Sequence, residues 1–400
     1  MIKDDATGLP TSYILEDRMQ LAMAQHQRKS QKAVLLLLES PKKIEPELKR
    51  LIGQRMQHAV RSTDIVCLLD DHTFGVLLTE LNDSDNAIRV ADVLLQRCQQ
   101  PYQQHGTTIK YHPVVGMAVY PDDGNTPQLI MERAQFALKG ARAEGPGTYQ
   151  FYTEDMNVRA HRRRNLAVAL KKAWARDELI VYGQPSFNRQ TENWVSTELL
   201  LRWEHPEQGI IPAEMFADIA QISGLWASAA EKLLASAVKA SEQFPKLRWT
   251  FNAPTLPDFK GVDDVIPLES FKSINIDPSK IGMEVPEVML SSYPDVASRW
   301  IQSWTDAGGF ISLDGAGENP IPGFIWNTLP ISELKTCLPP QVSFTHAIAS
   351  YMNWRCVYKN IDNSYIWDTL PDSPLVSAQG NGLYPVVPLH KLLASNPLRN

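Results

Sequence analysis

The apolar and polar positions of the first 150 residues follow two different periodicities. Apolar residues spaced among charged ones at 12–28 predict an amphipathic helix, and Ala33–Leu38 predicts a short buried strand. Two apolar runs, Ile65–Leu69 and Phe74–Leu78, flank a polar turn, which is typical of a β-hairpin. Further patterns predict helices at 47–60, 84–99 and 126–143 and a strand at 113–120. The mixture predicts an α+β sandwich, an antiparallel-type sheet with flanking helices.

From Leu179 onward the pattern changes to strand, loop and helix in repetition. Strands are predicted at 179–185, 195–202, 247–252, 281–285 and 310–314, and helices at 212–221 and 227–243. This alternation predicts an α/β fold, a barrel of the (β/α)8 type. A helix predicted at 154–176 joins the halves, and we interpret its basic run at 161–164 as a solvated face rather than a phosphate site. The chain is therefore divided into domains at 1–153 and 177–400 with a connecting helix at 154–176.

Four polar residues fall at or near the ends of predicted barrel strands. They are Glu198, Asn252, Glu284 and Asp314. In β/α barrels the chemistry lies at the carboxyl ends of the strands, and oxygen ligands suit hard divalent cations. Single polar residues can simply mark where strands end, but four of them on four strands favour a cation site.

Charge and composition limit the classes of partner. A net charge of −6 argues against general nucleic-acid binding, although a few local cations can still hold one anionic ligand. The longest aliphatic run is far shorter than the ~20 residues of a membrane span, and the N-terminus is charged where a signal peptide is apolar. We therefore expect a soluble, cytoplasmic chain with no transmembrane segment. The four cysteines form no CxxC pair and are predicted to be buried free thiols.

A set of short motifs in the first half follows the order found in one protein family. The motifs are Asp5–Pro10, Glu16–Arg18, Arg61–Asp64, Phe74–Leu78, Gly116–Gly124 and Ala137–Leu138. In this order they resemble a GGDEF domain of the diguanylate cyclase type. Arg61 and Asp64 match the RxxD inhibitory-type site of that family, which binds cyclic di-GMP, although an Arg–Asp pair can also lock a helix end.

The second half resembles an EAL domain of the cyclic di-GMP phosphodiesterase type. The matching segments are Tyr182–Pro185, Glu198–Trp203, His205–Pro206, Gly209–Pro212, Phe251–Asn252, Glu284, Leu313–Asp314, Leu334–Lys335 and Gln379–Gly380. The two resemblances together cover nearly the whole chain and imply a tandem GGDEF–EAL protein whose second domain is a modified (β/α)8 barrel.

Departures from the GGDEF pattern fall on the residues that carry its chemistry. The signature reads Asp70-Asp71-His72-Thr73-Phe74, without the glycine that lets the backbone approach a nucleotide. The first strand ends in Leu38-Glu39-Ser40 where the family has a metal-binding aspartate pair. The resemblance therefore implies a degenerate domain without cyclase activity. We interpret Asp70 and Asp71 as a polar hairpin turn rather than as a substitute metal pair.

The EAL half departs from its pattern at the second metal of the family's two-metal hydrolysis. Gly315 and Cys337 stand where aspartates are expected, Lys359 brings a cation where a carboxylate belongs, and Gln221 replaces a glutamate. We therefore predict a degenerate EAL domain with no catalytic residues and no required cofactor.

Ligand binding is a separate question from catalysis. Residues that match the family's cyclic di-GMP pocket are Gln184, Glu198, Leu200, Arg202, Asn252, Asp314, Lys335 and Gln379. A vestigial site for one divalent cation (Mg, Mn or Ca) would use Glu198, Asn252, Glu284 and Asp314.

Three hypotheses follow. The first is a non-catalytic cyclic di-GMP receptor or regulatory scaffold that acts on an unidentified protein partner. The second is an interaction module that needs no nucleotide, and the third is a residual phosphodiesterase. A homodimer is compatible with each, and the sequence does not say whether sensor or membrane segments precede this chain in a longer protein.

Overall fold

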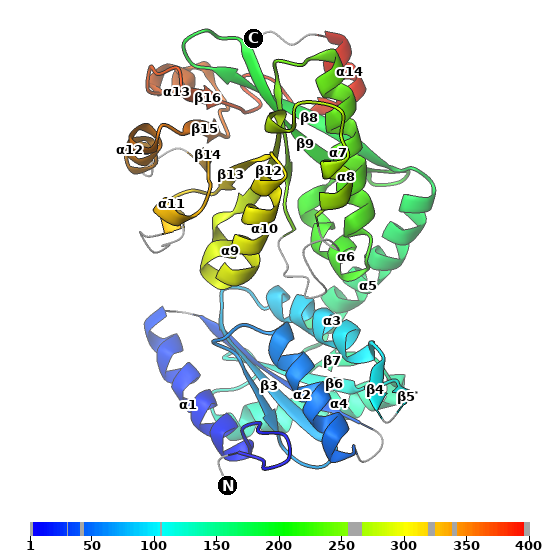
Figure 1. Ribbon diagram of the computed structural model, residues 1–400. Coiled ribbons are helices and arrows are strands. Elements are labelled where there is room, and N and C mark those ends of the chain that lie inside the picture. Colours follow the sequence, from blue (N-terminus) through cyan, green and yellow to red (C-terminus); the bar gives the residue numbers. More distant parts are fainter. Residues whose placement is uncertain are drawn as a thin grey trace. The chain divides into compact units, whose positions relative to one another are not determined.

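The computed structural model describes residues 3–29, 31–40, 44–104, 106–254, 266–318, 325–337 and 342–395. The chain divides into two compact units, residues 1–166 and 167–400, each with its own sheet (Figure 1). The boundary lies inside helix α5 (Glu154–Ala175), which is continuous. No helix of the described ranges combines the length and apolar character that crossing a bilayer requires.

The first unit is an α+β sandwich built on a five-stranded sheet. Its strands are β1 (Lys32–Glu39), β2 (Ile65–Leu68), β3 (Thr73–Leu81), β6 (Val114–Tyr120) and β7 (Tyr149–Phe151), in the order β2-β3-β1-β6-β7. All pairs are antiparallel except β6 with β7. The helices are α1 (Ser12–Lys29), α2 (Pro46–Ala59), α3 (Asp85–Gln99), α4 (Pro127–Glu144) and the start of α5. The predicted elements and the β2–β3 hairpin are confirmed, and a small hairpin of β4 (Tyr102–Gln104) and β5 (Thr107–Ile109) is an addition.

Both faces of the central strand β1 are buried. Val34, Leu36 and Leu38 belong to the core under α2 and α3, whereas Leu35 and Leu37 belong to the core under α1 and α4. Successive side chains of β1 point to opposite faces of the sheet, and each face is covered by a layer of helices. This explains why β1 is a continuous apolar run rather than an alternating one.

The second unit is a closed barrel of eight strands. The strands run β9 (Trp194–His205), β11 (Arg248–Asn252), β12 (Ile281–Pro286), β13 (Phe310–Asp314), β14 (Glu333–Cys337), β15 (Arg355–Lys359), β16 (Val376–Ala378) and β8 (Leu179–Asn188), and β8 pairs with β9. Strand β8 is antiparallel to both neighbours, and the others are parallel. The expected modified (β/α)8 barrel is confirmed, with one inverted strand.

Short strands and helices connect and cover the barrel. They are β10 (Gly209–Pro212), η1 (Ala213–Met215), α6 (Ala217–Ile222), α7 (Trp226–Gln243), α8 (Leu268–Lys272), η2 (Pro278–Lys280), α9 (Glu287–Ser292), α10 (Pro294–Asp306), α11 (Ile325–Thr328), α12 (Val342–Met352), α13 (Ser364–Thr369), β17 (Val387–Pro388) and α14 (Leu389–Ser395). The predicted helix at 212–221 is in fact the end of β10, the turn η1 and α6.

Candidate functional site

The polar residues singled out in the second half meet inside one end of the barrel. Strand pairing aligns them in neighbouring pairs: Gln184 with Glu198, Asn252 with Glu284, and Asp314 with Lys335. Glu198 lies within the long strand β9 and not near its end, because β9 extends past the barrel wall to pair with β10. Its partner on β11 is Thr250, two residues from the end of that short strand. Glu198 therefore still lies at the level of the barrel where the other polar residues meet.

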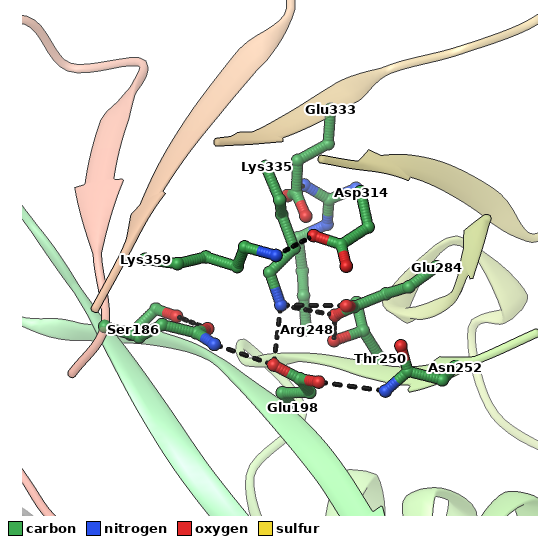
Figure 2. Close-up of polar contacts among 11 residues, drawn as sticks. Ser186, Glu198, Arg248, Thr250, Asn252, Glu284, Asp314, Glu333, Lys335 and Lys359 are labelled. Atoms are coloured by element: carbon green, nitrogen blue, oxygen red, sulfur yellow. Dashed lines mark hydrogen bonds and ion pairs between the residues drawn. The ribbon is translucent and has the colours of Figure 1, made fainter. Parts of the chain in front are cut away.

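A buried ammonium lies at the centre of this cluster (Figure 2). Lys335 Nζ is 2.7 Å from Glu198 Oε2 and 2.8 Å from both carboxylate oxygens of Glu284. The Lys335 side chain is 2% exposed and that of Glu284 is 1% exposed. The three N–H donors of the ammonium thus meet three carboxylate oxygens, which offsets the cost of burying the charges.

The remaining contacts of Glu198 come from amides. Asn252 Nδ2 donates to Glu198 Oε1 at 2.9 Å, and Gln379 Nε2 donates to Glu198 Oε2 at 2.7 Å. Burial alone would raise the pKa of the Glu198 carboxyl, but the Lys335 ammonium and these hydrogen bonds outweigh it and bring the pKa to about 2. Glu198 is therefore an ionised group whose two oxygens are already engaged.

Glu284 sits in a different electrostatic environment. Burial, followed by the nearby charge of Glu198, raises the pKa of Glu284, and the adjacent Lys335 ammonium opposes this rise. Thr250 Oγ1 also donates to Glu284 Oε1 at 2.5 Å. The Glu284 carboxylate is shielded from solvent, and both of its oxygens accept hydrogen bonds from side chains of the barrel strands.

A second lysine, Lys359 at the end of β15, reaches across to Asp314 at the end of β13 (Figure 2). Its ammonium donates to Asp314 Oδ1. Burial would lower the pKa of Lys359, but the Asp314 carboxylate more than compensates and raises it above the ordinary lysine range. Sequence reasoning noted this cation as a departure from the family and missed that it would neutralise Asp314.

A cavity of about 480 Å³ opens beside the cluster. Its polar wall includes Gln184, Glu198, Arg202, Asn252, Asp314, Lys359 and Gln379, and its apolar wall includes Leu199, Leu201, Phe216, Trp226 and Leu233. Leu200 and Gln221 also line it. Seven of the eight residues predicted for the ligand pocket therefore border one cavity. The exception, Lys335, lies behind the wall, because its donors point to Glu198 and Glu284.

Arg202 is the cavity-lining cation without a carboxylate partner among the described residues. Its Nη1 donates to the Leu201 carbonyl at 3.0 Å, while Glu204 accepts a hydrogen bond from the Tyr182 hydroxyl at 2.9 Å. Arg202 therefore forms no ion pair with Glu198 or Glu204. Its charge is available to a ligand in the cavity.

The divalent cation suggested by Glu198, Asn252, Glu284 and Asp314 does not fit this arrangement. Within the described ranges, no three His, Cys, Asp or Glu side chains are grouped to hold a metal ion. Lysine ammoniums already bond to Glu198, Glu284 and Asp314, and Asn252 presents an N–H to Glu198. The structure brings the four predicted side chains together, and Lys335 and Lys359 engage the three carboxylates among them.

The first unit shows a similar neutralisation at its hairpin. Lys49 of α2 is 2.5 Å from Asp71 Oδ1, and Asp70 accepts the backbone N–H of His72 at 2.7 Å. Glu39, at the end of β1, pairs with Arg142, whose Nε is 2.8 Å from Glu39 Oε1. These contacts agree with the polar-turn interpretation of Asp70 and Asp71.

The side chains of the inhibitory-type pair, Arg61 and Asp64, have different surroundings. Asp64 accepts the backbone N–H of Arg61 and that of Thr79, both at 3.0 Å, while the Arg61 side chain is exposed. Asp64 thus ties a turn to β3, and its two oxygens are both engaged. Ligand binding by Arg61 and Asp64 stays a prediction.

Comparison with known families matches both units. Residues 47–148 match the model of the diguanylate cyclase GGDEF domain, and residues 167–336 match that of the EAL domain. The chain is a tandem GGDEF–EAL protein. The part of the EAL domain after residue 336, which includes Lys359 and Gln379, lies beyond the matched range.

Known proteins and solved structures align with large parts of this chain. The chain is 27% identical over 351 residues to the bifunctional diguanylate cyclase/cyclic di-GMP phosphodiesterase MucR of Pseudomonas aeruginosa, covering 84% of this chain and 51% of MucR. It therefore spans about half the length of that relative. Among solved structures, the cGMP-bound EAL enzyme Bd1971 covers 92% of this chain and 95% of its own, with a TM-score of 0.54 and 15% identity. The cyclic di-GMP complex of the PaMucR phosphodiesterase covers 57% of this chain and 99% of its own, with a TM-score of 0.50 and 22% identity. These likenesses show the fold.

Proposed function

We propose that this tandem GGDEF–EAL protein works in cyclic di-GMP signalling as a receptor that binds the dinucleotide in the EAL barrel and does not hydrolyse it. The observation that carries the proposal is the Lys359 ammonium bonded to Asp314 on the wall of an open cavity, beside the Lys335 ion pairs with Glu198 and Glu284. Bound nucleotide would then be reported to a protein partner through a change in conformation.

The absence of hydrolysis follows from the state of the carboxylates. Two-metal hydrolysis needs carboxylates that are free to hold cations and to activate water. In this barrel the carboxylates of Glu198, Glu284 and Asp314 are bonded to lysines, and Cys337 stands where the family has an aspartate. The GGDEF unit supports the same conclusion for cyclisation, since Lys49 holds Asp71 in the hairpin turn.

Retention of ligand binding is supported by the cavity. Its volume of about 480 Å³ lies within the ~300–1,000 Å³ typical of small-molecule sites. Arg202 supplies a cation for a phosphate, and the partly exposed Trp226 on the apolar wall offers surface to a planar base. The relative PaMucR is known as a complex with cyclic di-GMP, which makes this dinucleotide the first ligand to test.

Calorimetric titration of the whole chain with cyclic di-GMP tests the proposal. We expect one binding event that Arg202→Ala abolishes and Arg61→Ala leaves intact. Chromatography after long incubation with magnesium or manganese should show neither linear dinucleotide from cyclic di-GMP nor cyclic product from GTP. Absence of both heat and a thermal shift at saturating nucleotide would refute the receptor and favour a nucleotide-independent interaction module.

A further inference from the structure

Lys359 is, beside Arg202, a second cation that lines the cavity. It ends β15, lines the cavity, and has a side chain that is 20% exposed beside an Asp314 side chain that is 23% exposed. An ammonium has three N–H donors, and the described contacts use one of them, on Asp314. The group is thus both anchored and accessible from the cavity.

The charges near Lys359 determine which kind of ion can approach its ammonium in the cavity. Glu198 and Glu284 are held by Lys335, and the carboxylate bonded to Lys359 is that of Asp314, while Glu214 and Asp362 also line the cavity. A divalent cation at Asp314 would have to displace a tethered ammonium or share the same oxygen with it, and like charges at that distance repel strongly. A phosphate anion is attracted by Lys359 and Arg202, which both line the cavity, although the carboxylates of Glu214 and Asp362 line it too.

We propose that the Lys359 ammonium takes the place of a divalent cation in this barrel, so that a phosphodiester group is bound without metal, with Asp314 as the residue that positions the lysine. The inference rests on the proposed receptor function and adds to it the identity of the cation. A lysine is a compact point charge that binds phosphate through charge-assisted hydrogen bonds. Unlike a metal ion, it activates no water, which agrees with binding without hydrolysis.

The first experiment measures affinity for cyclic di-GMP with the metal removed. In wild type we expect the same Kd in EDTA and in manganese chloride. Lys359→Met should weaken binding about tenfold to hundredfold, the effect of losing one charge-assisted hydrogen bond. Lys359→Arg, which keeps the charge, should stay within about threefold of wild type. Lys246→Met, at an exposed lysine of the same unit, is the matched control and should not change Kd.

The second experiment uses manganese chloride alone and follows free Mn²⁺ by electron paramagnetic resonance. Wild type should bind no Mn²⁺, whereas Lys359→Glu, which replaces the ammonium by a carboxylate next to Asp314, should gain a binding site. Lys359→Ser removes the ammonium without adding a carboxylate, so it separates the loss of the cation from the gain of a metal ligand in Lys359→Glu. Circular dichroism verifies that each variant is folded before it is compared.

Three results would overturn the inference. They are a wild-type affinity that EDTA abolishes, an affinity that Lys359→Met leaves unchanged, and Mn²⁺ binding that is equal in wild type and Lys359→Glu. If wild type binds no cyclic di-GMP in any buffer, the receptor function fails, and the manganese comparison still decides whether Lys359 excludes a metal.

Discussion

Lys335 and Glu284 form a doubly hydrogen-bonded ion pair inside the barrel, with the ammonium 2.8 Å from each carboxylate oxygen. The two residues are 51 positions apart in the chain and come from strands β14 and β12, which are separated by β13. Since both side chains are almost fully buried, each depends on the other for compensation of its charge.

Lys335→Met is expected to lower the unfolding free energy of the EAL barrel by about 3–5 kcal/mol, because it leaves two buried carboxylates without their cation. All ten tryptophans lie in residues 167–400, so tryptophan fluorescence during urea denaturation reports on the barrel alone. Adding Glu284→Gln to this variant removes one of the uncompensated charges and should restore part of the stability. If Lys335→Met alone were as stable as wild type, the structural role of the Lys335–Glu284 pair would be contradicted.

Asp64 is expected to be a structural residue of the GGDEF unit. Asp64→Ala removes the acceptor of two backbone N–H groups and should destabilise that unit by about 1–3 kcal/mol. Arg61→Ala, at an exposed side chain, should change stability by less than about 0.5 kcal/mol. Thermal unfolding followed by far-UV circular dichroism measures both. If Arg61→Ala instead removed a second cyclic di-GMP equivalent in calorimetry, the inhibitory-type site would be functional.

Gly116 on β6 is expected to tolerate no side chain. A Cβ at this position would lie 2.3 Å from both the Ala134 carbonyl oxygen and the Leu138 nitrogen of helix α4, so the helix would have to move off the sheet. Gly116→Ala should therefore destabilise the GGDEF unit by more than about 2 kcal/mol and increase hydrogen exchange in β6 and α4.

The matched control for this change is Gly106→Ala, because a Cβ there would meet no heavy atom within 4 Å. Its positive φ of 77° should cost about 1 kcal/mol of backbone strain, without faster exchange in α4. Equal effects of the two substitutions would show that the close packing of β6 on α4 does not limit position 116.

The thiols should differ in reactivity in the native protein. Burial raises the pKa of Cys67, Cys98 and Cys356 to about 12, so at pH 8 only about one in ten thousand of each is thiolate. Cys337 is partly exposed, although burial also raises its pKa. A colorimetric disulfide reagent at pH 8 should modify at most one thiol before unfolding and four in guanidinium chloride.

Cys337→Ser should then leave no reactive thiol in the native state. Rapid modification of two or more thiols in folded wild-type protein would mean that the buried cysteines open to solvent. The four cysteines are free in the structure, as the absence of a CxxC pair predicted, and three of them are buried.

Much of the fold was accessible from the sequence because it is encoded in local patterns. The apolar run at 33–38 becomes a strand buried on both faces, and the two runs around Asp70–Thr73 become the β2–β3 hairpin. The small β4–β5 hairpin escaped prediction because three-residue strands carry too few positions for a period to show.

The sequence by itself determined which chemical groups the two domains hold. It placed oxygen donors on successive barrel strands, and the family resemblance predicts Gly315, Cys337 and Lys359 where the family has carboxylates. These conclusions depend only on residue identity in an ordered set of motifs.

Only the tertiary structure decided how those groups are paired. Lys335 reaches Glu198 across 137 positions, and Lys359 reaches Asp314 across 45, because barrel closure and strand register bring distant strands to the same level. The same geometry leaves Arg202 facing a cavity and turns Asp64 toward the backbone. Electrostatic pairing depends on separations of a few ångströms, and no local pattern in the chain specifies separations between strands that far apart.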